Sequence, residues 1–168
     1  QDRGPLYDLT EELERADRAF CQDPENFQPF RVEQRVSWSA SAPGAHYFLT
    51  TLSRTPEPRL LEEIQWTDAF DPMTGAHIPT EELFSAGRDQ VIDALLAQMK
   101  GVEAPLAQEL RDAFQFSYLC FWPDHLSVRF PAGSLPSQEH SWGWSFGYDA
   151  LSGVLRPWAV PVEEPPEL

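Results

Sequence analysis

The fold is decided by residues 114–158, which read FQFSYLCFWPDHLSVRFPAGSLPSQEHSWGWSFGYDALSGVLRPW. They hold four of the six Trp, two of the four Tyr and five of the eleven Phe residues. Aromatic side chains carry a large apolar surface, so this stretch should build the densest part of a core. Strands are expected over residues 116–121, 126–130 and 140–148, the first two as a hairpin around the turn at Pro123 and Asp124.

The last of these strands alternates between large and small side chains. Its large face carries His140, Trp142, Trp144, Phe146 and Tyr148, and its other face carries Gly143, Ser145 and Gly147. We interpret the aromatic face as a core face that covers helices, although an exposed Trp pair beside His140 would also make a stacking platform for a sugar or a peptide. The small face leaves room for close packing, expected to be by a helix.

Upstream of this stretch, the patterns predict further helices and strands. Apolar residues three and four apart from Leu9 to Phe20 predict a helix capped by Asp8. β-forming residues predict strands over 31–39, 46–53 and 60–70, joined as an antiparallel meander. Helices are expected from Arg88 to a C-cap at Gly101 and over residues 105–114. The fold class is therefore α+β: an antiparallel sheet with two or three helices packed on one face.

Composition excludes several classes of function. The chain has 168 residues and a net charge of −15, so no basic surface is available for nucleic acid or for an anionic membrane. No stretch is apolar over the length of a membrane span. The chain begins at Gln1 without Met, as expected of a mature or trimmed product, and such a start is compatible with removal of a signal peptide or membrane anchor. A cationic partner would be attracted to such a chain, though the charge is also explained by solubility alone.

The residues that could take part in catalysis or bind a metal do not form a recognisable motif. The four His and two Cys residues have no metal-ligand spacing, so neither a metal site nor a cofactor is expected. Cys21 and Cys120 are compatible with one disulfide in an exported protein or with two buried thiols. The adjacent acidic pairs are typical of solvated faces, and no nucleophile or phosphate-loop motif is present. No catalytic residue is predicted.

Several segments, read in order, resemble the C-terminal domain family of RsiV-type anti-sigma factors, which is related to the PdaC-type accessory domain. They are 66–75 (WTDAFDPMTG), 78–84 (IPTEELF), 116–121 (FSYLCF), 124–131 (DHLSVRFP) and 146–151 (FGYDAL). The resemblance covers roughly residues 46–155 as a pattern of order and spacing. It implies a non-catalytic, extracytoplasmic domain of a bacterial cell-envelope protein, secreted or membrane-anchored. In the anti-sigma factor itself this region binds lysozyme, a basic protein.

This chain departs from the family in the loop 132–139, where family members usually carry a Tyr. A loop of this kind is a natural recognition surface, so we expect ligand-binding residues there, together with one aromatic at the hairpin end. The predicted contact residues are Trp122, Ser134, Gln138, Glu139 and His140.

The expected organisation is an N-terminal helix and lead-in over 1–30, an α+β domain over 31–158 and a disordered acidic tail over 159–168. The expected function is sensing or binding, with a basic, lysozyme-like protein or a cell-wall ligand as the partner. Two alternatives stay open. One is a cell-wall hydrolase that uses carboxylates such as Asp68 or Glu82, and the other is a purely structural module. Converging carboxylates in a deep pocket would favour the hydrolase, and a groove near residues 131–140 would favour the binder.

Overall fold

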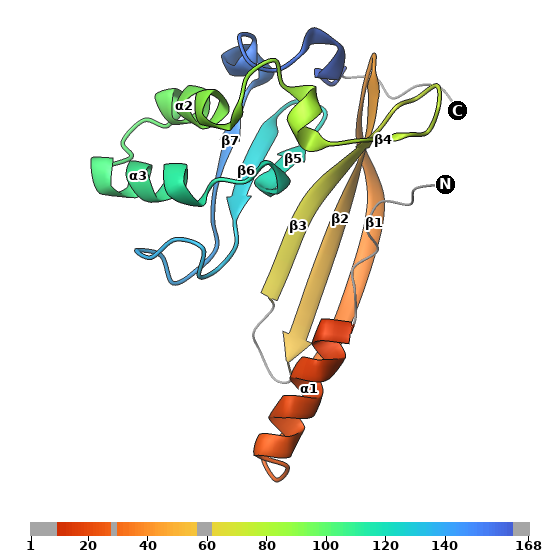
Figure 1. Cartoon of the computed structure of the whole chain (residues 1–168), viewed down its shortest axis with the longest axis vertical. Helices are drawn as coiled ribbons and strands as arrows, with labels where there is room; N and C mark the ends of the chain where they lie inside the picture. Colours follow the sequence, from red (N-terminus) through yellow and green to blue (C-terminus); the bar gives the residue numbers. More distant parts are fainter. Residues whose placement is uncertain (1–9, 28–29, 57–61, 163–168) are drawn as a thin grey trace.

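The computed structural model describes residues 10–27, 30–56 and 62–162 (Figure 1). The predicted cap at Asp8, the residue Leu9 and the tail residues 163–168 lie outside these ranges. Within them, helices and strands follow one another as α1 Thr10–Gln22, β1 Phe30–Ala42, β2 Ala45–Pro56, β3 Glu62–Phe70, β4 His77–Ile78, η1 Thr80–Leu83, α2 Arg88–Gln98, α3 Ala104–Ala113, η2 Phe116–Tyr118, β5 Leu119–Phe121, β6 Leu126–Phe130, β7 Trp142–Phe146, η3 Tyr148–Leu151 and η4 Pro157–Ala159.

The strands form two antiparallel sheets, which confirms the α+β class but divides the expected single sheet. The order is β1-β2-β3-β4 in the first sheet and β5-β6-β7 in the second. Strands β1 to β3 run side by side along the longest axis of the molecule, with the second sheet, α2 and α3 on one side of them (Figure 1). The predicted meander corresponds to β1, β2 and β3, whose pairing is continuous apart from a bulge between Trp38 and Ala40.

The two sheets meet where β3 lies against β5. The Phe121 N–H donates to Thr67 Oγ1 at 3.2 Å, and the Tyr47 and Phe121 rings stack with their centroids 4.5 Å apart. Tyr47 is fully buried, and its hydroxyl donates to the Ala159 carbonyl at 2.5 Å. Burial raises the pKa of this tyrosine. Residues 159–162 of the predicted disordered tail therefore belong to the body, because the Val162 N–H also donates to the Ser41 carbonyl.

Helices α2 and α3 cover the aromatic face of the second sheet, as the sequence predicts. Cross-strand pairing places Trp142 opposite Phe130 and Trp144 opposite Val128, on the face that meets the helices. The helices bury residues at helical spacing against this face, namely Val91, Ile92, Leu95 and Leu110. Burying a side chain of this size is worth about 1.5–3 kcal/mol, so this layer holds the second sheet to the helices.

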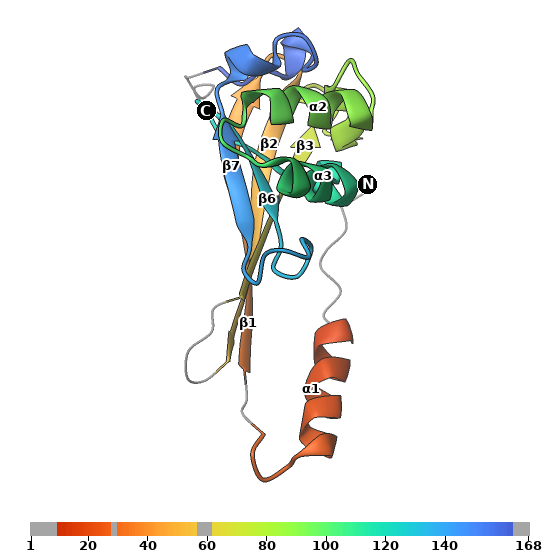
Figure 2. The same ribbon diagram turned by 90° about the vertical axis from the view of Figure 1, so that its left-hand side faces the viewer.

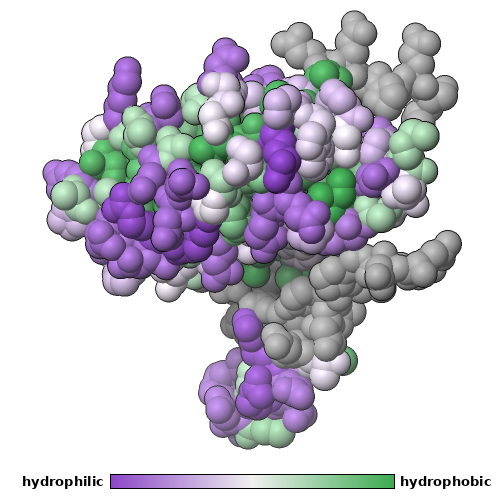
Figure 3. All heavy atoms as spheres, turned by 45° about the horizontal axis from the view of Figure 1, so that its top comes forward, coloured by the Kyte–Doolittle hydropathy of each residue, from purple (hydrophilic) through white to green (hydrophobic). Residues whose placement is uncertain are grey.

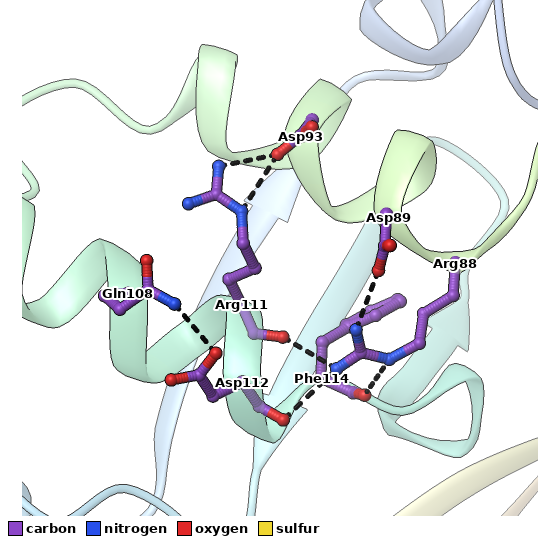
Figure 4. Close-up of polar contacts among 7 residues, drawn as sticks. All are labelled: Arg88, Asp89, Asp93, Gln108, Arg111, Asp112 and Phe114. Carbon is purple, nitrogen blue, oxygen red and sulfur yellow. Dashed lines mark hydrogen bonds and ion pairs between the residues drawn. The ribbon is translucent and has the colours of Figure 1, made fainter.

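Arg88 joins the start of α2 to the end of α3 (Figure 4). Its Nε donates to the Phe114 carbonyl at 3.0 Å, and Nη2 donates to the carbonyls of Arg111 at 2.7 Å and Asp112 at 3.2 Å. The last carbonyls of a helix have no partner within the helix, so one guanidinium caps three acceptors. Nearby, Arg111 pairs with Asp93 at 2.6 Å across the two helices.

α1 has the predicted amphipathic pattern but does not pack on the sheets. Leu13 is 70% exposed and Phe20 is 50% exposed, and the Phe20 ring contacts Phe27 in the loop that follows. Figure 2 shows α1 apart from the strands, attached at the lower end of the molecule. In Figure 3 it projects from the body with a mainly hydrophilic surface. No helix among the described residues is long and apolar enough to cross a membrane.

Candidate ligand-binding groove

A groove of about 790 Å³ opens between β3 of the first sheet and the outer face of β6 and β7 in the second. We call it the β3–β7 groove. It is lined from β3 by residues 63–66, from η2 by Ser117 and Tyr118, and from β6 and β7 by residues 127–131 and 141–145. Its volume lies in the range of small-molecule sites.

The outer face of β6 and β7 consists mainly of small polar residues. On β7 the aromatic side chains point toward the helices, so Ser141, Gly143 and Ser145 face away from them. A Cβ atom on Gly143 would lie 3.1 Å from the Val128 carbonyl oxygen and 3.6 Å from Arg129 Cγ. The sequence predicted this small face but assigned a helix to it. In the described part of the chain no helix packs there, and the face lines the groove instead.

Arg129 of β6 reaches across to β3 and is the cation of the groove. Its Nη1 donates to Gln65 Oε1 at 2.7 Å and lies 3.6 Å from Glu63 Oε1. Gln65 Nε2 in turn donates to Glu63 Oε1 at 2.7 Å, so the amide oxygen faces Arg129 and the amide nitrogen faces the carboxylate. Half of the Arg129 side chain is exposed, and within the described residues Nε and Nη2 have no hydrogen-bond partner. The guanidinium can therefore bind a further acceptor.

Trp66 and Tyr118 bring aromatic surface to the groove. The Trp66 indole Nε1–H donates to Asp68 Oδ2 at 3.1 Å, which fixes the ring on β3. The Trp142 and Trp144 rings stack 6.0 Å apart, yet both are half-buried against the core. The tryptophan pair therefore packs against the core, as the core interpretation predicts, and both residues also line the groove.

The loop predicted to bind ligand forms the rim at one end of the groove. Its ends, Pro131 and Ser141, line the groove, but Ser134, Gln138, Glu139 and His140 do not. The loop is held to the body because Leu135 is buried and the Ser137 N–H donates to Glu109 Oε2 at 3.0 Å. Inside the loop, the Ser134 hydroxyl donates to the Pro131 carbonyl at 2.6 Å.

The structure separates Trp122 from the other predicted contact residues. Trp122 lies in the β5–β6 turn, whereas the loop follows the far end of β6, a strand of five residues that spans roughly 17 Å. Trp122, the aromatic predicted as a contact residue at the hairpin end, is partly buried. Its Nε1–H donates to Ser127 Oγ at 3.0 Å, and its ring stacks on His125. The predicted set of five residues therefore does not form one site.

Sequence patterns did not identify the residues that do come together. Gln65 and Arg129 are 64 positions apart, and their contact follows from how the two sheets meet. One feature of the sequence pointed to Arg129. It is the only charged residue between Leu126 and Phe130, and the β7 residues on its face of the sheet are small. An arginine next to serines and a glycine on one sheet face indicates an open, polar surface.

The outer face of the first sheet carries a second, shallower depression of about 530 Å³. His46, Asp68 and Asp71 are among its lining residues. Their polar atoms are engaged, since His46 Nδ1 lies 2.7 Å from Ser41 Oγ and Asp68 Oδ1 lies 3.4 Å from His77 Nε2. Asp71 Oδ1 accepts the N–H groups of the turn that follows it, and these bonds lower the pKa of Asp71.

The two cysteines are both free thiols. Cys21 is exposed on α1 and Cys120 is buried in β5, so the disulfide alternative does not apply to this structure. Burial raises the pKa of the Cys120 thiol to about 11, although a hydrogen bond with Thr67 opposes the shift. No group of three potential metal ligands was found within the described ranges.

Comparison with known proteins identifies the fold. No family model matches the sequence, and no curated protein matches it. A DUF3298 family protein from Pseudomonas aeruginosa PAO1 superposes with a TM-score of 0.52 at 13% identity, over 95% of this chain and 75% of that one. A DUF3298 member from Bacteroides fragilis superposes with a TM-score of 0.52 at 8% identity, over 89% of this chain and 62% of that one.

At these identities the similarity is one of fold alone. The structural neighbours belong to a bacterial domain family of unknown function, which is compatible with the predicted relation to the PdaC-type accessory domain. The narrower RsiV-type assignment stays a prediction.

Proposed function

We propose that this chain is a non-catalytic binding domain that acts outside the cytoplasm and holds its ligand in the β3–β7 groove. The observation that carries the proposal is the groove itself. It lies next to the loop 131–140, and among the described residues Glu63 is its only lining carboxylate. Acid–base hydrolysis of a glycosidic bond uses two carboxylates on either side of that bond. A groove with one carboxylate, one arginine, serines and aromatic surface is suited to holding a ligand.

The partner that fits best is a basic protein, with a cell-wall ligand as the other candidate. The net charge of −15 attracts a cationic protein and speeds its encounter with the chain. The resemblance to the lysozyme-binding domain family points in the same direction. The groove adds a place for that partner to bind, which neither charge nor resemblance supplies.

The hydrolase alternative has less support. Both carboxylate oxygens of Asp68 already have partners, in Trp66 and His77. Glu82 is exposed on η1 and lines neither the β3–β7 groove nor the depression on the first sheet. The two candidate carboxylates are therefore not arranged around a shared cavity.

The experiment compares binding of the wild-type chain with that of a groove-blocking variant. Hen lysozyme and purified peptidoglycan sacculi are the two probes. Ser145→Trp places an indole in the groove without touching the core, and Ser152→Trp places one on an exposed serine outside it. We expect at least one probe to bind with a Kd below about 1 μM, and Ser145→Trp to weaken that binding roughly tenfold or more. Ser152→Trp should bind as the wild type does.

Two results would contradict the proposal. In the first, neither probe binds more tightly than about 1 μM. In the second, the wild-type chain releases reducing sugar from sacculi and Asp68→Asn abolishes that release, which would establish the hydrolase. The location is tested separately by fractionating cells that express the full-length gene, and recovery in the cytoplasm would contradict it.

A further inference from the structure

The edge of β3 that faces the β3–β7 groove has no partner strand over most of its length. β4 pairs with β3 only at Ala69 and Phe70. From residue 62 to residue 68, β3 pairs with β2 on one side and with no described strand on the other. An open strand edge presents a row of main-chain donors and acceptors, and folded proteins usually cover or disrupt such edges.

The direction of the main-chain groups on this edge follows from hydrogen bonds at its end. The Asp71 N–H donates to the Ala76 carbonyl at 2.8 Å, toward the β4 side. Main-chain groups in an antiparallel strand alternate in direction, so those of Ala69, Thr67, Gln65 and Glu63 also point away from β2. The same alternation, followed from β3 through β2 to β1, predicts that the main-chain groups of Ser41 point away from β2. The Ser41 carbonyl accepts the Val162 N–H on that side, which agrees with the assignment.

The open edge and the groove are the same place. Residues 63–66 all line the groove, and neighbouring residues of a strand point to opposite faces. Four consecutive lining residues therefore mean that the edge itself forms the wall. The second sheet leaves this space open because β5 covers only residues 119–121, and the chain before it turns away as η2. Opposite the edge stand the small side chains of Ser141, Gly143 and Ser145.

We propose that the groove takes an extended segment of a basic partner protein, which adds to β3 as a further strand. This inference rests on the proposed function and specifies how the ligand is held. Main-chain N–H and C=O groups at Glu63 and Gln65 pair with the segment, as in other cases of strand addition. Small side chains of the segment face the serines and Gly143, and the unpaired guanidinium nitrogens of Arg129 bind one of its carbonyls.

Strand addition is favoured because the open edge of β3 offers unpaired main-chain groups at a regular two-residue spacing. A sugar has no matching two-residue repeat of donors and acceptors. A helix, with a diameter of about 10 Å and its own main-chain bonds satisfied, would leave the edge unpaired. The opposite edge of the same sheet, on β1, has Gln34 and Val36 in the equivalent outward positions, but in the described part of the chain no second sheet stands beside it.

The test uses a random peptide library displayed on phage, selected on the wild-type chain and eluted by competition. Peptides are then synthesised with and without N-methyl groups at alternate residues, which remove main-chain donors and keep the side chains. We expect methylation in one of the two alternating sets to weaken binding at least roughly tenfold, and the other set to have little effect. Amide exchange at Glu63 and Gln65, fast in the free chain, should slow when the unmethylated peptide binds.

Two pairs of variants complete the test. Gln65→Pro removes an outward N–H without breaking the β2–β3 ladder, and Gln34→Pro does the same on the β1 edge. Gln65→Pro should abolish peptide binding and Gln34→Pro should preserve it, with Gln65→Ala as the control for the lost side chain. If Gln65→Pro does not fold, Ser145→Trp addresses the same groove from the second sheet, and Ser152→Trp, which lies outside the groove, is its control.

The outcomes separate this inference from the proposed function. One outcome would overturn strand addition and leave groove binding intact. In it, Ser145→Trp weakens peptide binding, but N-methylation in either alternating set does not, and the Glu63 and Gln65 amides exchange as fast as in the free chain. Peptides that bind equally well to wild type and Ser145→Trp would also overturn strand addition in this groove. Failure of lysozyme and sacculi to bind would overturn the proposed function by its own criterion.

Discussion

Replacing Arg88 should destabilise the chain far more than replacing the neighbouring Arg111. Both arginines lie between α2 and α3 and have similarly exposed side chains, 40% and 41%. They differ in their partners. Arg88 donates to three main-chain carbonyls and lies over the Phe114 ring at 5.9 Å, whereas among the described residues the Arg111 side chain donates only to the Asp93 carboxylate.

The magnitude follows from the bonds that are lost. A hydrogen bond from a charged donor is worth about 1.5–3 kcal/mol when buried, and partial exposure lets water replace some of it. Three such bonds on adjacent carbonyls are not additive, so we expect Arg88→Ala to lower the free energy of unfolding by about 2–4 kcal/mol. Arg88→Lys keeps the charge but loses the planar fork that reaches several carbonyls at once, so it should cost about half as much. Arg111→Ala breaks an exposed ion pair and should cost about 0–1 kcal/mol.

The assay is urea unfolding followed by tryptophan fluorescence and by circular dichroism. The slope of free energy against urea should stay constant between variants, so that the midpoint alone reports stability. In a thermal scan the Arg88→Ala difference corresponds to a fall in Tm on the order of 10 °C. Equal effects of Arg88→Ala and Arg111→Ala, or a loss below about 1 kcal/mol for Arg88→Ala, would refute the capping role.

Three further predictions concern single residues in the body of the molecule. Because the pKa of Cys120 is raised from 9.0 to about 11, its contribution to stability is complete below pH 9 and is lost as pH rises toward 11, by about 2–3 kcal/mol relative to Cys120→Ala. Tyr148→Phe removes a hydroxyl that donates to the Trp122 carbonyl at 2.7 Å and should cost about 1–2 kcal/mol in urea unfolding. Gly44→Ala places a Cβ 2.7 Å from the Trp158 ring and should cost about 1–3 kcal/mol with a change in Trp158 fluorescence.

Each of these predictions has an internal control. Cys21 is exposed and should react with Ellman's reagent in the native state, while Cys120 reacts only on unfolding; equal rates would contradict the burial argument. Tyr118 has no hydroxyl partner in the described part of the chain, so Tyr118→Phe should be nearly neutral, and a cost equal to that of Tyr148→Phe would count against the hydrogen bond. A Cβ added to Gly147 would meet no described atom within 4 Å, so Gly147→Ala should be tolerated where Gly44→Ala is not.

Local pattern predicted much of the fold. Strict alternation from Trp142 to Phe146 gave the last strand and its core face, and the spacing of Val91 and Leu95 gave α2. These features depend on neighbours along the chain, which a sequence displays directly. The pattern predicted the helix α1 but not its position. An apolar stripe indicates that one face of a helix needs to be covered, and it does not identify the surface that covers it.

The groove depends on contacts that the sequence does not display. It exists because β5 is short and because β3 meets the second sheet at Thr67, so that residues 63–66 and residue 129 face one another across a gap. The predicted contact residues were chosen from loop composition and from a departure from family pattern. Ser134 and Gln138 instead stay within a rim that is held to the body through Leu135 and Ser137.

The orientation of the Gln65 amide determines which ligands can bind well in the groove. Its nitrogen donates to Glu63 and its oxygen accepts from Arg129. A flipped amide would place its oxygen against the Glu63 carboxylate and its NH2 group against the Arg129 guanidinium, and both contacts would be repulsive. A ligand that draws the guanidinium toward itself must therefore supply an N–H or O–H to the amide oxygen. Once water is excluded, a ligand without that donor leaves the oxygen unpaired at a cost of about 1–3 kcal/mol, a discrimination of roughly 5- to 150-fold. One neutral side chain thus screens ligands by the donor they carry and not by their charge.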